Sequence, residues 1–269
     1  MAVILPELLA DLAAETSVVD AMLTGLRAAD WQRPTPAAGW AIRDQVSHLA
    51  FFDEAAAMAA TDPDRFRAET AALLALGPTF PDQVADRYRT MPPWELLEWF
   101  RTARAELLRV FGTLEGRTRA PWYGPDMSVT SSVTARLMET WAHGQDIADT
   151  LGVALTPTDR LRHIAHLGVR TFGFSFQLRG RPVPDAPVLV DLTAPSGQRW
   201  TWGENSTGDT VSGPALDFCL VVTQRRNLAD TALRVTGATA AQWLSIAQAF
   251  AGAPGPGRRP GEPTVREIA

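Results

Sequence analysis

The chain has 269 residues, of which 46% are hydrophobic and 20% charged, a composition typical of a globular protein with an apolar core. Its formal net charge of −5 provides no electrostatic basis for binding nucleic acid or an anionic membrane, so we expect neither as a partner. The single cysteine excludes an intramolecular disulfide, the first residues lack a basic segment, and no apolar run approaches about 20 residues, so we expect a cytoplasmic protein without signal peptide or membrane span.

Four long helices are predicted in the first part of the chain. Apolar positions at helical spacing predict the first over residues 4–29, and a loop with proline and glycine separates it from a second at about 41–60. A mobile or partly helical connection then leads to a third helix at about 90–114. After a long loop, a fourth helix is predicted over about 129–151, with Gly152 as its C-cap. Four such helices favour an antiparallel bundle.

The pattern changes after residue 155, which we take as the end of the helical domain 1–155. Residues 156–252 predict a smaller α+β domain, which begins with a helix at about 158–178. A β-hairpin turning near Pro195 follows, and then two short strands, each leading into a helix. Residues 253–269 are rich in proline and glycine, so we expect a disordered or loosely attached tail. The predicted fold class is therefore α+β with two domains.

Glu139 and His143 are four residues apart in the fourth predicted helix, so their side chains share one helix face. By spacing alone, a solvated Glu–His contact is commoner than half of a metal site. A catalytic zinc takes three protein ligands and keeps one position open, so a third ligand is needed. His48 lies on the apolar side of the second helix, where a metal shared with the pair would satisfy it. The alternative is a core histidine bonded to a carbonyl or carboxylate.

Other polar candidates are less well supported. His163 and His166 could form a second ligand pair, but the apolar residues around them favour histidines at a helix surface or a domain interface. Asp146 could accept a hydrogen bond from a ligand imidazole. Cys219 stands in an apolar segment and is predicted to be a small buried hydrophobe.

The loop before the fourth helix contains Trp122 and Tyr123. Core packing or loop anchoring explains most of the aromatic residues of this half of the chain. These two are nevertheless the best placed to line a substrate pocket, because they precede the helix that carries the candidate ligands. Gly144, directly after His143, is expected to leave room beside an ion.

Two segments carry a family resemblance. GWAIRDQVSHLAFFDE, residues 39–54, resembles the Gly-Trp…His-Leu-Ala segment of the DinB-like superfamily in its mycothiol-dependent maleylpyruvate isomerase branch. RLMETWAHGQDIADTLG, residues 136–152, resembles the second metal segment of that branch. The resemblance implies a DinB-like four-helix bundle and a smaller C-terminal α+β domain, often compared with sterol-carrier-like folds. It also implies His48, Glu139 and His143 as ligands of a divalent metal, usually zinc.

The family further implicates an arginine near the end of the penultimate helix of the C-terminal domain. Arg225 matches it best as a catalytic residue, and Arg226 is a second candidate to contact substrate. Gln224 departs from the family pattern, in which a small residue, commonly glycine, precedes the arginine. The alternative is that both arginines are cations at a helix C-terminus, favoured there by the helix dipole.

A site of two histidines and a glutamate can hold a thiolate, or it can activate water or polarise a carbonyl. In the family the first route serves mycothiol, so the resemblance implies a zinc-dependent isomerase or S-transferase that uses this thiol on a small electrophilic substrate. Two alternatives stay open: a thiol-independent Lewis-acid or hydrolytic enzyme of secondary metabolism, and a non-catalytic, metal-stabilised protein that binds a small ligand. We expect a monomer or a homodimer.

Overall fold

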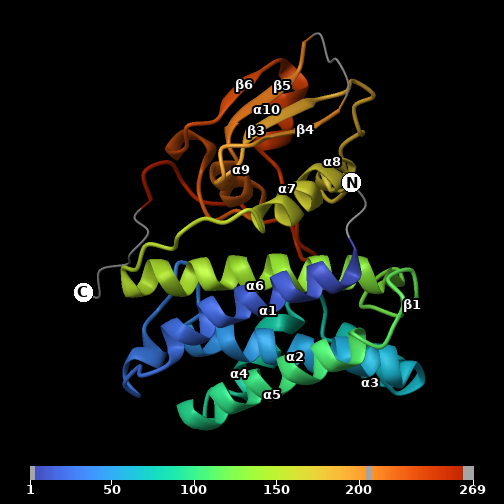
Figure 1. Ribbon diagram of the computed structural model, residues 1–269, viewed down its shortest axis with the longest axis vertical. Helices are drawn as coiled ribbons and strands as arrows, with labels where there is room; N and C mark the ends of the chain where they lie inside the picture. The colour runs from blue at the N-terminus through green and yellow to red at the C-terminus, as the bar shows by residue number, and fades with distance from the viewer. Residues whose placement is uncertain (1–3, 204–207, 263–269) are drawn as a thin grey trace. The chain divides into compact units, whose positions relative to one another are not determined.

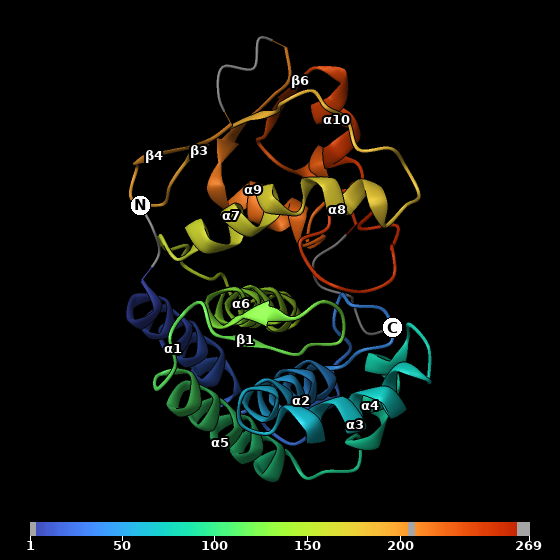
Figure 2. The same ribbon diagram turned by 90° about the vertical axis from the view of Figure 1, so that its right-hand side faces the viewer.

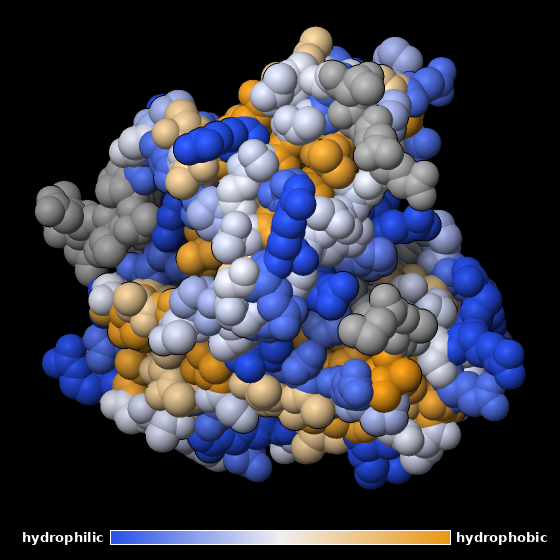
Figure 3. All heavy atoms as spheres, turned by 45° about the horizontal axis from the view of Figure 1, so that its top comes forward, coloured by the Kyte–Doolittle hydropathy of each residue, from blue (hydrophilic) through white to orange (hydrophobic). Residues whose placement is uncertain are grey.

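The structure is a computed structural model that describes residues 4–203 and 208–262. The chain folds into two compact units, with the division between Ala154 and Leu155 (Figure 1). We call them the bundle unit and the sheet unit. On the face drawn in Figure 3, hydrophilic and apolar residues are interspersed over both units. Within the described ranges, no helix is both long and apolar enough to cross a membrane.

Four long helices build the bundle unit, and Figure 2 shows them nearly end-on. They are α1 (Leu5–Leu23), α2 (Ile42–Thr61), α5 (Pro93–Phe111) and α6 (Val129–Leu151). The predicted fourth helix is confirmed, and it ends at Gly152, whose φ of 70° is the left-handed conformation that glycine adopts at a helix C-terminus. The first helix is shorter than predicted because the chain turns away after Leu23 and forms the short 3-10 helix η1 (Asp30–Gln32).

The bundle is not antiparallel throughout, which corrects the expectation from the sequence. Asp53 of α2 pairs with Arg104 of α5, and Arg43 at the start of α2 donates to the Met91 carbonyl just before α5. These two contacts have the same order in both helices, so α2 and α5 run parallel. The connection between them allows this, because it is long enough to return the chain to the end of the bundle where α2 begins.

That connection is more regular than the sequence suggested. It contains two helices, α3 (Pro63–Leu74) and α4 (Phe80–Arg87), and both carry a proline in their first turn, where the missing N–H costs no hydrogen bond. The loop before α6 contains a two-stranded antiparallel sheet of β1 (Arg119–Ala120) and β2 (Met127–Ser128).

The sheet unit has four strands in the order β4-β3-β5-β6. The expected hairpin is confirmed as β3 (Leu189–Thr193) and β4 (Arg199–Trp202), while β5 (Thr210–Pro214) is parallel to β3 and β6 (Arg234–Thr236) is antiparallel to β5. The helices are α7 (Leu161–Arg170), α8 (Phe172–Gln177), α9 (Ala215–Val222) and α10 (Ala238–Leu244), with the 3-10 helix η2 (Leu228–Asp230). The single helix expected over 158–178 is thus interrupted at Thr171.

The described part of the C-terminal tail is hydrogen-bonded to the sheet unit. The side-chain amide of Asn227 donates to the Arg258 carbonyl at 2.7 Å, and the N–H of Gly261 donates to the carboxylate of Asp230 at 2.9 Å. Polar side chains of the sheet unit therefore bond the backbone of a segment that has few apolar residues of its own. The last part of the predicted tail, 263–269, lies outside the described residues.

Gly144 serves helix packing, and the room that we expect it to leave beside an ion stays a prediction. A Cβ atom at this position would lie 2.9 Å from Cγ2 of Val19, so the glycine allows α6 to approach α1 closely. Thr130 at the start of α6 bonds the Gly116 carbonyl, and Gly116 in turn lies close to Leu5 at the start of α1. The order of these contacts shows that α1 and α6 also run parallel.

Replacing Gly144 by leucine should destabilise the bundle unit by about 1–3 kcal/mol, because the new side chain has to displace α1 from α6. The measurement is urea-induced unfolding followed by circular dichroism. Gly124→Leu is the control, since a Cβ there meets no atom within 4 Å. Equal unfolding midpoints for the two variants would contradict this role of Gly144.

Candidate metal centre

The antiparallel contact between α2 and α6 brings the three predicted ligands together. One atom each from His48, Glu139 and His143 lies within 4.8 Å of the other two. Nε2 of His48 is 3.3 Å from Oε2 of Glu139, and Nε2 of His143 is 3.0 Å from the same oxygen. The side chains are 9–17% exposed, so the group lies at the edge of the core and not within it.

These distances fit a metal ion. Ligand atoms held at about 2.0–2.1 Å in a tetrahedral zinc site lie roughly 3.3 Å apart. Two imidazole nitrogens and one carboxylate oxygen are also a donor set that occurs in catalytic zinc sites, which keep a further position open. The residues present therefore fit a divalent metal.

The carboxyl group of Glu139 is held in its ionised form. Burial raises its pKa, but hydrogen bonds from His143 and His48 and the charges of both imidazoles outweigh this effect and hold the pKa well below its usual range. Glu139 is therefore a carboxylate at neutral pH, which is the form that binds a metal.

Gln45 bonds the far nitrogen of His143 and is a residue that the sequence analysis missed. Its Oε1 accepts a short hydrogen bond from Nδ1 of His143. Its Nε2 donates to Oγ1 of Thr35 at 2.8 Å, and Thr35 in turn donates to the Trp40 carbonyl at 2.8 Å. An acceptor at Nδ1 holds a proton on that nitrogen, so Nε2, which donates to Glu139 in this structure, is the nitrogen that would give up its proton and bind a metal. The signal was available, because Gln45 precedes His48 by three residues and therefore shares its helix face.

Aromatic rings surround the two imidazoles. The Trp40 ring stacks on His143 with 5.9 Å between centroids and 15° between planes, and its Nε1 donates to the Asp82 carboxylate at 2.7 Å. On the other side, Phe52 lies 4.6 Å from His48, centroid to centroid. Nδ1 of His48 has no hydrogen-bond partner among the described residues, so packing against these rings holds the His48 side chain.

Below the ligands lies a buried ionic network. Nε of Arg104 donates to Oδ2 of Asp53 at 2.8 Å, Nη2 donates to Thr140 at 2.9 Å, and Nη1 makes a short hydrogen bond to Thr16. These bonds connect α1, α2, α5 and α6. Nη1 of Arg136 lies 3.8 Å from Oδ1 of Asp53. One carboxylate therefore faces two guanidinium groups in the core of the bundle unit.

Trp122 and Tyr123 belong to an aromatic cluster beside Phe52. Trp122 stacks on Phe66 at 5.9 Å, and Tyr123 meets Phe52 edge-on at 5.4 Å between centroids. Burial raises the pKa of the Tyr123 hydroxyl, so it stays protonated. The two residues thus lie one aromatic ring away from His48, and their role toward a substrate stays a prediction.

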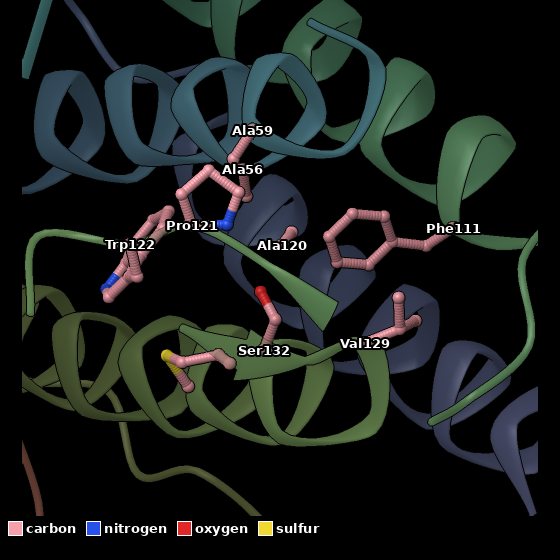
Figure 4. Close-up of a pocket in the computed structure, with 9 residues that line it drawn as sticks. Ala56, Ala59, Phe111, Ala120, Pro121, Trp122, Val129 and Ser132 are labelled. Carbon is pink, nitrogen blue, oxygen red and sulfur yellow. The ribbon is translucent and has the colours of Figure 1, made fainter. Parts of the chain in front are cut away.

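Trp122 also lines a small pocket between α2 and α6 (Figure 4). Ala56 and Ala59 of α2 face Val129 and Ser132 of α6 across it. The remaining lining residues are Phe111, Ala120, Pro121 and Met127. The lining is mainly apolar, and the small side chains of the two alanines are what keeps it open.

The other predicted site residues differ in their surroundings. Asp146 is buried one turn after His143, but the acceptor at the His143 ring is Gln45, and the role of Asp146 beside an imidazole stays a prediction. His166 accepts a hydrogen bond from Trp202 at 3.2 Å, and burial lowers its pKa. Within the described ranges, neither His163 nor His166 belongs to a group of potential metal ligands. Cys219 is fully buried, and burial raises the pKa of its thiol, as expected for a residue of the core.

Arg225 and Arg226 follow α9 in the sheet unit, directly after a left-handed residue. Gln224 has a φ of 60°, and no other non-glycine residue of the described chain has a positive φ. The N–H group of Gln224 donates to the Val221 carbonyl, and that of Arg225 donates to the Leu220 carbonyl. These two bonds form a Schellman motif, the helix end in which a glycine usually adopts the left-handed conformation. This explains why glycine suits position 224. In this chain Nε2 of Gln224 donates to the Ala247 carbonyl at 3.1 Å, and that bond helps to hold the conformation.

Comparisons with known proteins give the family and the fold to which this chain is similar. A family model described as the mycothiol maleylpyruvate isomerase N-terminal domain matches residues 12–148. Two uncharacterized proteins of Mycobacterium tuberculosis, from strains CDC 1551 / Oshkosh and H37Rv, are each 45% identical over 249 residues, 93% of this chain and 97% of theirs. Crystal structures of mycothiol-dependent maleylpyruvate isomerase and of a point mutant have TM-scores of 0.58 and 0.57 at 16% identity, covering 83% of this chain and 90% of theirs. At that identity they show a shared fold.

Removing the shared carboxylate by Asp53→Ala should cost on the order of 3–5 kcal/mol, because two buried guanidinium groups then lose their counter-ion. Asp20→Ala breaks a half-exposed pair with Arg101 and should cost no more than about 1 kcal/mol. Denaturant unfolding of both variants makes the comparison. Similar losses of stability would show that the network is not a main source of bundle stability.

Proposed function

Because the chain belongs to the mycothiol maleylpyruvate isomerase family, we propose that it is a divalent-metal-dependent enzyme that uses mycothiol as an isomerase or S-transferase on a small electrophilic substrate. The observation that carries the proposal is the convergence of two imidazole nitrogens on one carboxylate oxygen, at 3.0 and 3.3 Å. We expect zinc as the metal, held by His48, Glu139 and His143.

A bound divalent ion would lower the pKa of a thiol and hold the thiolate at its open position. The protein prepares the site for this in three ways. Gln45 keeps the proton of His143 on Nδ1, Glu139 is already ionised, and the Trp40 and Phe52 rings restrict the orientation of the imidazoles. Ligands held in this way lose little conformational entropy when the ion binds.

The substrate side of the proposal concerns two aromatic residues and two arginines. We propose that Trp122 and Tyr123 exclude water from the electrophile, because their cluster lies next to the ring that contacts His48. We propose Arg225 as a cation that contacts the substrate during reaction, with Arg226 as an additional binding residue, on the basis of the family pattern. The planar fork of either guanidinium suits a carboxylate.

Metal content measured by mass spectrometry tests the ligand set. The wild type should retain stoichiometric zinc after gel filtration, whereas His48→Ala and Glu139→Ala should lose it, because two protein ligands do not hold the ion tightly. Glu106→Ala, which removes an exposed carboxylate paired with Arg109, should retain the metal. Unchanged zinc in both ligand variants would remove the basis of the proposal.

Turnover assays with the zinc-loaded protein test the use of a thiol. Conversion of maleylpyruvate or a related small electrophile should require added mycothiol, because the thiolate is the proposed nucleophile. Equal turnover without any thiol would contradict this function and would favour the Lewis-acid alternative.

The contribution of Gln45 can be measured separately. Gln45→Leu removes the acceptor at His143 Nδ1 and should weaken zinc binding by about 10–100-fold, as is usual for the loss of such an outer partner. Gln45→Glu keeps an acceptor and should retain tight binding. Competition with a chromophoric chelator gives both affinities. Equal affinity in Gln45→Leu and the wild type would show that the tautomer is set in another way.

A further inference from the structure

A buried cation with incomplete hydrogen bonding lies one helical turn before Glu139. Arg136 of α6 is 4% exposed, and its Nη1 has no hydrogen-bond partner among the described residues. It faces Oδ1 of Asp53 at 3.8 Å, beyond hydrogen-bond distance, and that oxygen also has no partner within the described chain. Buried charged groups are normally paired and hydrogen-bonded, so this arrangement calls for an explanation.

The surrounding side chains leave Arg136 without a complete set of acceptors. Oδ2 of Asp53 is bonded to Arg104, whose other two nitrogens bond Thr16 and Thr140. Arg104, Arg136 and Asp53 are all more than nine-tenths buried, and Asp53 is hydrogen-bonded to only one of the two guanidinium groups. The next carboxylate along α6, that of Glu139, bonds His48 and His143, so Nη1 of Arg136 lacks an acceptor within the described chain, which is costly for a buried charged group. A ligand carboxylate would supply this acceptor.

Arg136 lies between the proposed metal ligands and the pocket of Figure 4. On the same face of α6, Glu139 is three residues after it, and Ser132, which lines the pocket, is four residues before it. Cζ of Arg136 is 5.8 Å from the centre of the Phe52 ring, which itself contacts His48. The guanidinium is therefore connected to the proposed metal ligands through the Phe52 ring and through one turn of α6.

We propose that Arg136 binds a carboxylate group of the substrate, in an anion site between the metal ligands and the Trp122 pocket. The site selects small electrophiles that carry a carboxylate one helical turn from the reacting carbon. In the ligand-free protein, Asp53 partly neutralises the guanidinium, and Phe52 covers one of its faces. The role in selecting the substrate rests on the proposed function, but the anion site itself does not require a metal.

Equilibrium binding of maleate, a small dicarboxylate, tests the site in metal-free and zinc-loaded protein. Calorimetry should show that Arg136→Gln weakens maleate binding at least about tenfold in both forms, since a charge-assisted hydrogen bond is lost. Arg109→Gln, an exposed arginine on α5, should bind maleate like the wild type. Dimethyl maleate, which has no charge, should bind weakly to all variants.

Thermal unfolding of the same proteins separates ligand binding from a purely structural role. Because Nη1 of Arg136 is buried without an acceptor, Arg136→Gln should melt at or above the wild-type temperature without ligand, and maleate should raise the melting temperature of the wild type alone. Arg136→Lys keeps the charge but loses the fork, so it should fold and bind maleate more weakly.

The outcomes of these experiments distinguish failure of the anion-site proposal from failure of the proposed function. Maleate affinity that does not change in Arg136→Gln, or a wild type that does not bind maleate, would overturn the anion site. A lower melting temperature for Arg136→Gln with unchanged maleate binding would show instead that Arg136 only supports Asp53. Loss of zinc or of thiol dependence, with maleate binding still dependent on Arg136, would contradict the proposed function and leave the anion site standing.

Discussion

The register of α2 against α6 is the constraint on which the site depends. Antiparallel packing places Gln45 opposite His143 and His48 opposite Glu139, and it places Asp53 opposite Arg136 two turns further on. A shift of one helix by a single turn would separate both imidazoles from the carboxylate. Packing of these two helices therefore places the proposed metal ligands, the acceptor bonded to one of them and the proposed anion site in one arrangement.

The polar groups between α2 and α6 are partly exposed at one end of the interface and fully buried in its centre. At one end, two imidazoles and a carboxylate lie at the edge of the core, where an ion and a small molecule can reach them. In the centre, Arg104 and Asp53 are sealed among four helices and are bonded to Thr16 and Thr140. The central network connects the four helices, and it leaves Nη1 of Arg136 without an acceptor, which is the basis for proposing a ligand there. Asp53 thus contributes to the stability of the bundle unit through Arg104, and it also faces Arg136 of the proposed anion site.

The sequence predicted those features that depend on local spacing. The bounds of α6, its glycine cap and the shared face of Glu139 and His143 all follow from residues close together in the chain. Joining His48 to that pair required the family resemblance, because helix contacts are not visible in one sequence. The parallel pairing of α2 with α5 was predicted incorrectly, because it depends on contacts between distant segments. The packing of Gly144 against α1 depends on such contacts as well, and the sequence did not predict it. Gln45 could have been found from its spacing to His48.

X-ray absorption at the zinc edge, recorded on the zinc-loaded protein before and after addition of mycothiol, tests a metal-held thiolate most directly. We expect a first shell of nitrogen and oxygen alone at about 2.0–2.1 Å without the thiol, and a new sulfur neighbour at about 2.3 Å with it. Because Cys219 is buried in the sheet unit, a sulfur seen only with the thiol must come from mycothiol. An unchanged nitrogen and oxygen shell at saturating mycothiol would contradict a metal-held thiolate as the centre of this enzyme.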